Sequence, residues 1–69
     1  MNFNEHEYYS AENTDLAVLI NEVVDQDKFF VEFYGTLFNK NTLTIYEHEY
    51  YQLQKEDITH WSRYELPKQ

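Results

Sequence analysis

The sequence predicts an α+β fold in which one amphipathic helix packs on a three-stranded antiparallel meander, preceded by an N-terminal extended arm or edge strand. Two observations carry this prediction. Apolar residues recur at helical spacing within residues 11–26, and the pattern changes to alternation from residue 28 onwards. The 69 residues are expected to form a single domain, residues 1–69, at the lower size limit for an unaided hydrophobic core.

Residues 1–9 are expected to form the arm or edge strand, and residues 11–26 the helix. A stripe at positions i, i+3, i+4 and i+7 indicates one apolar helix face. This stripe consists of Leu16, Leu19, Ile20 and Val23. Ser10 or Asn13 would cap the helix N-terminus, and the opposite, outward face would be acidic.

The second half of the chain is expected to form three strands, at residues 28–38, 42–53 and 58–66. Phe29, Val31 and Phe33 alternate with polar or aromatic residues, which is typical of a strand with one buried face. Asparagine-rich residues 39–41 form a turn, and Pro67 ends the last strand.

The charge of the chain is unevenly distributed. The net charge is −8, and residues 1–27 contain seven acids with no Lys or Arg, whereas residues 28–69 contain six acids and five bases. The acidic run is interpreted either as a solvated face or as a negative field directed at a basic partner. Repulsion of phosphates argues against direct binding of nucleic acid.

The pentapeptide Glu-His-Glu-Tyr-Tyr occurs twice, at residues 5–9 and 47–51. On a strand, the His of each copy points away from its two Glu, so one copy cannot surround a metal ion, and no metal or cofactor is predicted. For the same reason one Tyr of each pair must face outward. Alternation from Leu43 and Ile45 places Glu47 and Glu49 on the core side, so either a bulge changes the register or the strand extends beyond the core, and the second is expected.

Several function classes lack the residues that they require. The chain has no cysteine, no glycine-rich phosphate loop and no serine in a nucleophile elbow, so no enzymatic activity is predicted. Residues 2–9 lack the basic start of a signal peptide, and the longest apolar run, residues 16–20, is too short for a membrane span. These observations predict a cytoplasmic protein without a membrane partner.

The end of the chain resembles a family of small uncharacterised phage and prophage proteins. The resemblance lies in Asp57-Ile58-Thr59-His60-Trp61, followed by Leu66-Pro67. In that family Leu-Pro follows the Trp more closely, and glycine-rich hairpins usually precede it. The resemblance implies a phage origin, and therefore the cytoplasm of a bacterial host, but no activity.

The predicted function is a non-enzymatic, phage-type inhibitor of a basic host protein that handles nucleic acid. Its partner would be a nuclease, a CRISPR effector, a polymerase or a DNA-binding regulator, and the chain resembles, as a class, small acidic DNA-mimic and anti-CRISPR proteins. The predicted partner-binding surface consists of Glu5, Glu7, Asp15, Glu22, Asp25, Asp27, Glu47, Glu49 and Tyr50.

Two alternatives remain open. A small structural or assembly protein would oligomerise through a Tyr-rich strand edge, and homodimerisation would also compensate for the small core. A metal-dependent domain would need both pentapeptide copies to converge on one ion.

Overall fold

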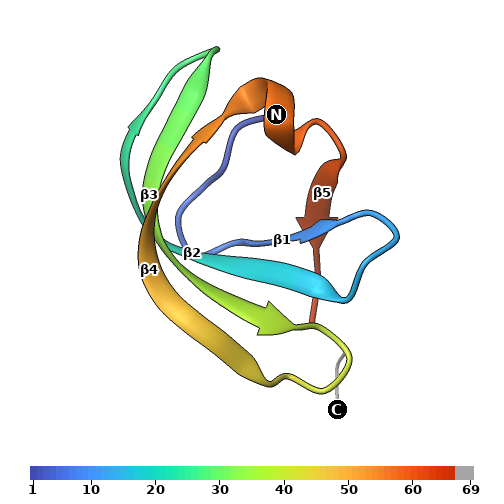
Figure 1. The fold of residues 1–69 in the computed structure, drawn as a ribbon. Coiled ribbons are helices and arrows are strands. Elements are labelled where there is room, and N and C mark those ends of the chain that lie inside the picture. Colours follow the sequence, from blue (N-terminus) through green and yellow to red (C-terminus); the bar gives the residue numbers. More distant parts are fainter. Residues whose placement is uncertain (67–69) are drawn as a thin grey trace.

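The computed structural model describes residues 1–66, which form one five-stranded antiparallel sheet and a 3₁₀ turn (Figure 1). The elements are β1 (Tyr8–Ala11), β2 (Leu16–Gln26), β3 (Phe30–Asn39), β4 (Ile45–Gln54), η1 (Lys55–Ile58) and β5 (Trp61–Tyr64). The order across the sheet is β4-β3-β2-β1-β5, so four consecutive strands form a meander and β5 returns to the far side of β1.

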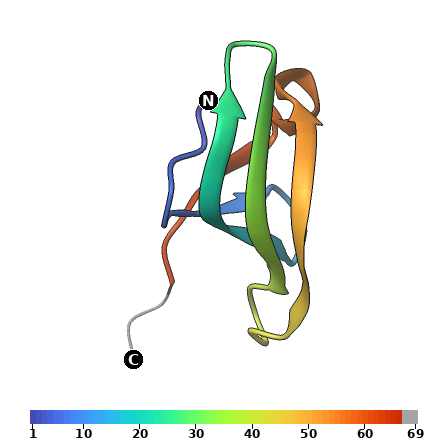
Figure 2. The same cartoon turned by 90° about the vertical axis from the view of Figure 1, so that its left-hand side faces the viewer.

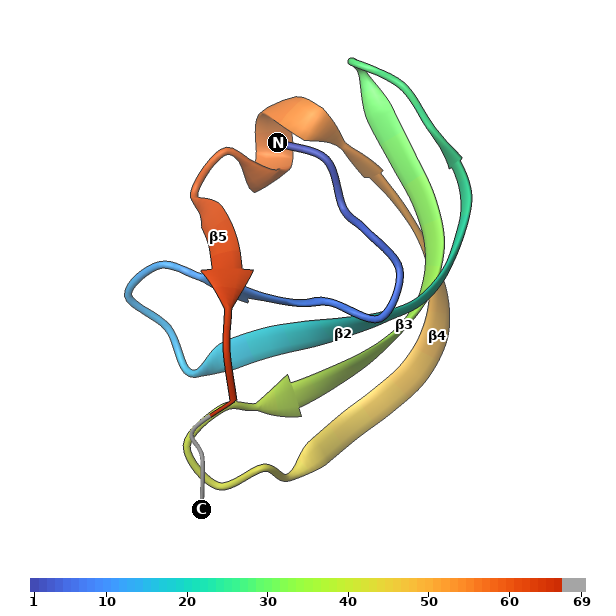
Figure 3. The same ribbon diagram turned by 180° about the vertical axis from the view of Figure 1, so that it is seen from behind.

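The sheet is strongly curved, and its concave side holds the core (Figures 1 and 3). The core cluster consists of Phe3, Tyr9, Val18, Ile20, Val31, Phe33 and Ile58. A row of aromatic rings runs through the core. The ring of Phe3 stacks on Tyr9 and meets Phe33 edge-on, with centroid distances of 4.5 and 5.4 Å. The Phe33 centroid lies 5.3 Å from that of Tyr51. Aromatic side chains thus compensate for the short chain.

The predicted α+β fold is wrong, because residues 11–26 form the end of β1, a loop and β2 instead of a helix. Register shifts between Ile20 and Glu22 and between Val23 and Asp25 mark two irregularities in β2. Each inserts an extra residue, and the first makes the inward step from Ile20 to Val23 three residues instead of two. The bulged strand therefore imitates helical spacing.

The predicted three-stranded meander is also wrong at its third strand. Ile58 belongs to η1, and Trp61–Tyr64 pairs with β1 instead of with the strand at residues 45–54. Ile58 is buried and Trp61 packs against the core cluster, so this segment covers one end of the concave side. Pro67, predicted to end the last strand, lies outside the described residues.

The N-terminal arm takes the place of a strand beside part of β2. The His6 N–H donates to the Ile20 carbonyl at 2.7 Å, and the Ile20 N–H donates to the Glu7 carbonyl at 3.0 Å. Farther along, the Phe3 N–H donates to Oε1 of Gln26 at 2.7 Å, and Nε2 of Gln26 donates to the Phe3 carbonyl at 2.9 Å. The arm brings Phe3 into the core and Glu5 next to β2.

Candidate protein-binding surface

The two pentapeptide copies do not lie side by side. Glu5–Tyr9 spans the arm and the start of β1, whereas Glu47–Tyr51 lies within β4, and β2 and β3 separate them. The two copies therefore cannot converge on one metal ion. Across residues 1–66, no group of three or more His, Asp or Glu is arranged to hold a metal.

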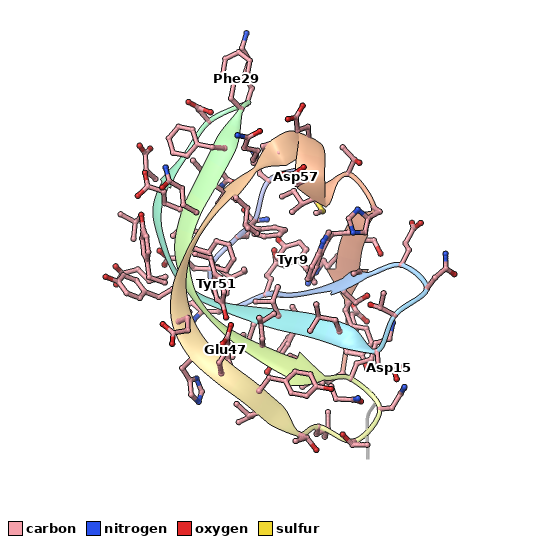
Figure 4. The ribbon with its side chains drawn as sticks, in the orientation of Figure 1. Tyr9, Asp15, Phe29, Glu47, Tyr51 and Asp57 are labelled. Carbon is pink, nitrogen blue, oxygen red and sulfur yellow. The ribbon has the colours of Figure 1, made fainter. Side chains whose placement is uncertain are left out.

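Each copy sends its second Tyr inward and its first Tyr to the convex side. Tyr9 is 2 % exposed, Tyr51 is half-buried, and both lie on the concave side of the sheet (Figure 4). Tyr8 packs edge-on against Phe38 at 5.8 Å, whereas Tyr50 is 45 % exposed. The predicted division of each Tyr pair between two faces is confirmed.

In each copy a carboxylate holds the inward phenol. Tyr9 donates to Oε1 of Glu7 at 3.3 Å, and Tyr51 donates to Oε1 of Glu47 at 2.6 Å. Burial, followed by this hydrogen bond, raises the pKa of the Tyr51 phenol. Burial also raises the pKa of Tyr9, although the Asn4 N–H that donates to its oxygen opposes the shift.

Figure 2 shows the convex side of β2, β3 and β4 face-on, and this side carries a different group of residues. Strand register places Glu22, Tyr34 and Tyr50 in one row across the sheet, and Asp25 opposite Glu32 in the next. Directly opposed side chains share a face. We call these five residues the tyrosine–carboxylate face.

The two tyrosines of this face are exposed and lie together. Tyr34 is 49 % and Tyr50 is 45 % exposed, and their rings are 5.5 Å apart. The Tyr50 hydroxyl donates to Oε2 of Glu32, and this hydrogen bond is the main cause that raises the pKa of Tyr50. The aromatic rings are thus held beside the carboxylates.

The carboxylates of the face have no cationic partner among residues 1–66. Asp25 lies directly opposite Glu32, and like charges in this position destabilise a sheet. The ion pair found within residues 1–66 joins Arg63 of β5 to Glu7, which precedes β1, at 2.7 Å, and so involves no residue of the face. The negative charge of the face is therefore left uncompensated.

A shallow hollow of about 270 Å³ adjoins the two tyrosines. Its lining consists of Asn21, Tyr34, Gly35, His48, Glu49 and Tyr50. Asn21 donates to the Thr36 hydroxyl at 3.0 Å, and that hydroxyl lies 2.7 Å from Nδ1 of His48, so a hydrogen-bonded chain crosses three strands. Glu49 also lines this hollow, although its pairing with Gly35 places it in the same row of β4 as Glu47.

Glu5 and Asp27 lie along the same half of β2 as Asp25, but their carboxylates also accept hydrogen bonds from backbone N–H groups. Oε1 of Glu5 accepts from the Val23 N–H at 3.0 Å. Oδ1 of Asp27 accepts from the N–H groups of Phe29 and Phe30 at 2.6 and 3.0 Å, which closes the β2–β3 turn.

The remaining predicted acids lie elsewhere. Asp15 precedes β2 at its opposite end (Figure 4), where it accepts from the Asn41 side chain at 2.6 Å. Glu7 is paired with Arg63. Glu47 lies on the core-side row of β4 and remains exposed. A register shift between Ile45 and Glu47 interrupts the alternation on which the prediction was based, because Ile45 pairs with Phe38 and Glu47 with Leu37. The nine predicted residues therefore do not form one continuous surface.

Two residues of the tyrosine–carboxylate face, Glu32 and Tyr34, were absent from the predicted surface. Both belong to the half of the chain in which acids and bases nearly balance. The alternation at residues 28–38 puts them on one face, but only the pairing of β2 with β3 brings Asp25 opposite Glu32. Sequence distance conceals this juxtaposition.

A larger hollow of about 780 Å³ lies at the end of the β2–β3 hairpin and contains two of the basic residues, Lys28 and Lys55. Phe29, predicted to lie on a buried face, is 69 % exposed at the tip of this hairpin, and Nζ of Lys28 lies 5.1 Å from its ring (Figure 4). The chain turns there, so Phe29 has no core to face.

The fold and this surface define an all-β protein that presents an acidic, tyrosine-containing sheet face. Comparison of the chain with protein-family models, curated proteins and solved structures finds no match. No helix within residues 1–66 is long and apolar enough to cross a membrane.

Proposed function

We propose that this protein is a non-enzymatic, phage-type inhibitor that binds a basic, nucleic-acid-handling protein through the tyrosine–carboxylate face. The observation that carries the proposal is the opposition of Asp25 and Glu32 next to the exposed Tyr34 and Tyr50. A like-charge pair of this kind weakens the isolated sheet, and a basic partner would relieve the repulsion. The compartment that the proposal implies is the cytoplasm of a bacterial host.

The chemistry of the face suits a protein partner. Exposed tyrosines supply large, rigid contact area at low entropic cost, and they are enriched among the residues that dominate binding energy. Carboxylates opposite each other across strands stand about 5 Å apart, which is of the same order as the 3.4 Å between charges along one DNA strand. A groove that accepts a phosphate backbone could therefore accept this face.

The test is a double variant that removes charge and keeps shape, Glu22→Gln with Asp25→Asn. The protein is immobilised, bacterial lysate is applied at low salt, and bound proteins are eluted with rising salt. We expect wild type to retain basic DNA- or RNA-binding proteins, and the double variant to associate with the purified partner about tenfold more slowly.

A matched control is Glu12→Gln with Glu56→Gln, which removes the same charge from two exposed positions outside the face. The control is expected to bind as wild type does. The decisive readout is competition, because wild type should displace duplex DNA from the purified partner and the double variant should not. Equal displacement by both would refute the role of the face.

A further inference from the structure

The two edges of the sheet differ in how well they are protected. β5 has four residues and carries Arg63, which pairs with Glu7, the residue before the neighbouring strand β1. β4 has ten residues, Ile45–Gln54, with no Lys, Arg or Pro, and among residues 1–66 it pairs only with β3 (Figure 2). Its register shift against β3 lies near its start, between Ile45 and Glu47, and the pairing from Glu47 to Gln54 is regular. Long edge strands present unpaired N–H and C=O groups to a further strand unless charge, proline or distortion prevents it.

Glu47 and Glu49 make this edge favour a strand with basic side chains. They occupy alternate positions, so they stand about 7 Å apart on the same side of the strand. Both are exposed, and neither is in an ion pair among residues 1–66. An added strand with cationic side chains at alternate positions would place a charge opposite each carboxylate.

The same carboxylates oppose pairing with a second copy. The segment Tyr46-Glu47-His48-Glu49-Tyr50 reads identically in both directions. Antiparallel pairing centred on His48 puts Glu47 opposite Glu49 of the second copy, twice. Pairing centred on either Glu puts that Glu opposite itself. Every central register therefore opposes like charges, which acts against self-association.

We propose that β4 accepts, as a sixth strand, an extended segment of a basic partner that has Lys or Arg at alternate positions opposite Glu47 and Glu49. Backbone hydrogen bonds supply affinity in this mode, and the paired charges select the register. The inference rests on the proposed function for the nature of the partner. Tyr50 connects the edge to the tyrosine–carboxylate face, since it belongs to both β4 and that face.

The chain itself provides the probe. In the variant Glu47→Lys with Glu49→Lys, β4 becomes the basic strand that the proposal requires. Pairing centred on His48 then puts each Glu of wild type opposite a Lys of the variant. We expect each protein alone to be monomeric and the equimolar mixture to form a dimer, measured by sedimentation equilibrium, with affinity falling roughly tenfold from low to moderate salt.

Amide hydrogen exchange locates the contact. Exchange within Ile45–Gln54 should slow in the mixture, because edge N–H groups gain acceptors. No dimer in the mixture, or a dimer of wild type alone, would overturn the inference. If the double Lys variant does not fold, a peptide of alternating Lys and Thr replaces it, and an alternating Glu and Thr peptide is the control that should not bind.

Failure of this inference can be distinguished from failure of the proposed function. The variant Glu22→Gln with Asp25→Asn keeps both edge carboxylates, so it should dimerise with the double Lys variant as wild type does. Capture of a basic partner that requires Glu22 and Asp25, without dimerisation at the edge, would leave the face intact and remove the sixth strand.

Discussion

Glu5–Tyr9 and Glu47–Tyr51 have the same five residues, but the first leads into an inner strand of the sheet and the second lies on an edge strand. In both, a Glu accepts from the inward Tyr. In the first copy that Glu is also paired with Arg63, whereas in the second the carboxylates face solvent. The pentapeptide specifies which Tyr of each pair faces inward, but not the accepting Glu, since Glu7 is the third residue of its copy and Glu47 is the first. The position in the sheet determines which groups remain free for a partner.

Truncation of the inward tyrosines should give the largest difference in stability between the two copies. Tyr9→Ala removes a fully buried ring and is expected to cost about 3–5 kcal/mol of the free energy of unfolding. Tyr51 is half-buried, so Tyr51→Ala should cost roughly half as much. Urea unfolding followed by circular dichroism measures both.

The exposed Tyr50→Ala is the control for truncation and should change stability by less than about 0.5 kcal/mol. Tyr9→Leu keeps an apolar side chain and replaces Tyr9→Ala if the latter does not fold. Equal costs at Tyr9 and Tyr51 would contradict the assigned difference in burial.

Removal of the hydroxyl alone tests the carboxylate contact. Tyr9→Phe leaves the Asn4 N–H without its acceptor and should cost about 1 kcal/mol. Tyr51→Phe should cost less, because the exposed Glu47 regains water when its donor is lost. A larger cost at Tyr51 than at Tyr9 would show that the edge copy contributes more to the fold than its burial indicates.

The two copies should also differ in how the free energy of unfolding changes with pH in the alkaline range. Folding raises the pKa of Tyr51, so the folded chain keeps a proton that the unfolded chain loses near the ordinary value of 10.0. The stabilisation is complete below pH 10, and it is lost as the pH rises above it.

The measurement is the urea midpoint from neutral pH to roughly pH 11. Tyr51→Phe should flatten the alkaline decline more than Tyr9→Phe, because the Asn4 N–H opposes the rise of the Tyr9 pKa and no such donor acts on Tyr51. An unchanged slope in Tyr51→Phe would rule out its phenol as a contributor.

Alternation predicted the parts of the fold that follow regular pairing. The strands expected at residues 28–38 and 42–53 correspond to β3 and β4, and the division of each Tyr pair follows from the same period. The helix prediction failed because the extra residue at the first irregularity of β2, between Ile20 and Glu22, moves Val23 to the inward side. Spacing alone does not distinguish a bulged strand from a helix turn.

The structure brings only part of the predicted surface together, because the predicted helix is a strand. Glu22 and Asp25 are near in sequence and lie on one face, whereas Asp15 lies just before the other end of β2. A helix would have shortened that separation, since a residue advances a helix by about 1.5 Å and a strand by about 3.3 Å. Glu32 could be added only once the strand pairing was known.

Several carboxylates of residues 1–27 also accept hydrogen bonds from backbone N–H groups. A strand with two irregularities and a supporting arm leaves N–H groups unpaired, and Glu5, Asp25 and Asp27 accept from such groups at Val23, Gln26 and the β2–β3 turn. Lysine has no acceptor and could not replace them. The amide of Asn or Gln keeps a carbonyl oxygen, so the charge of this region can be removed while its architecture is retained.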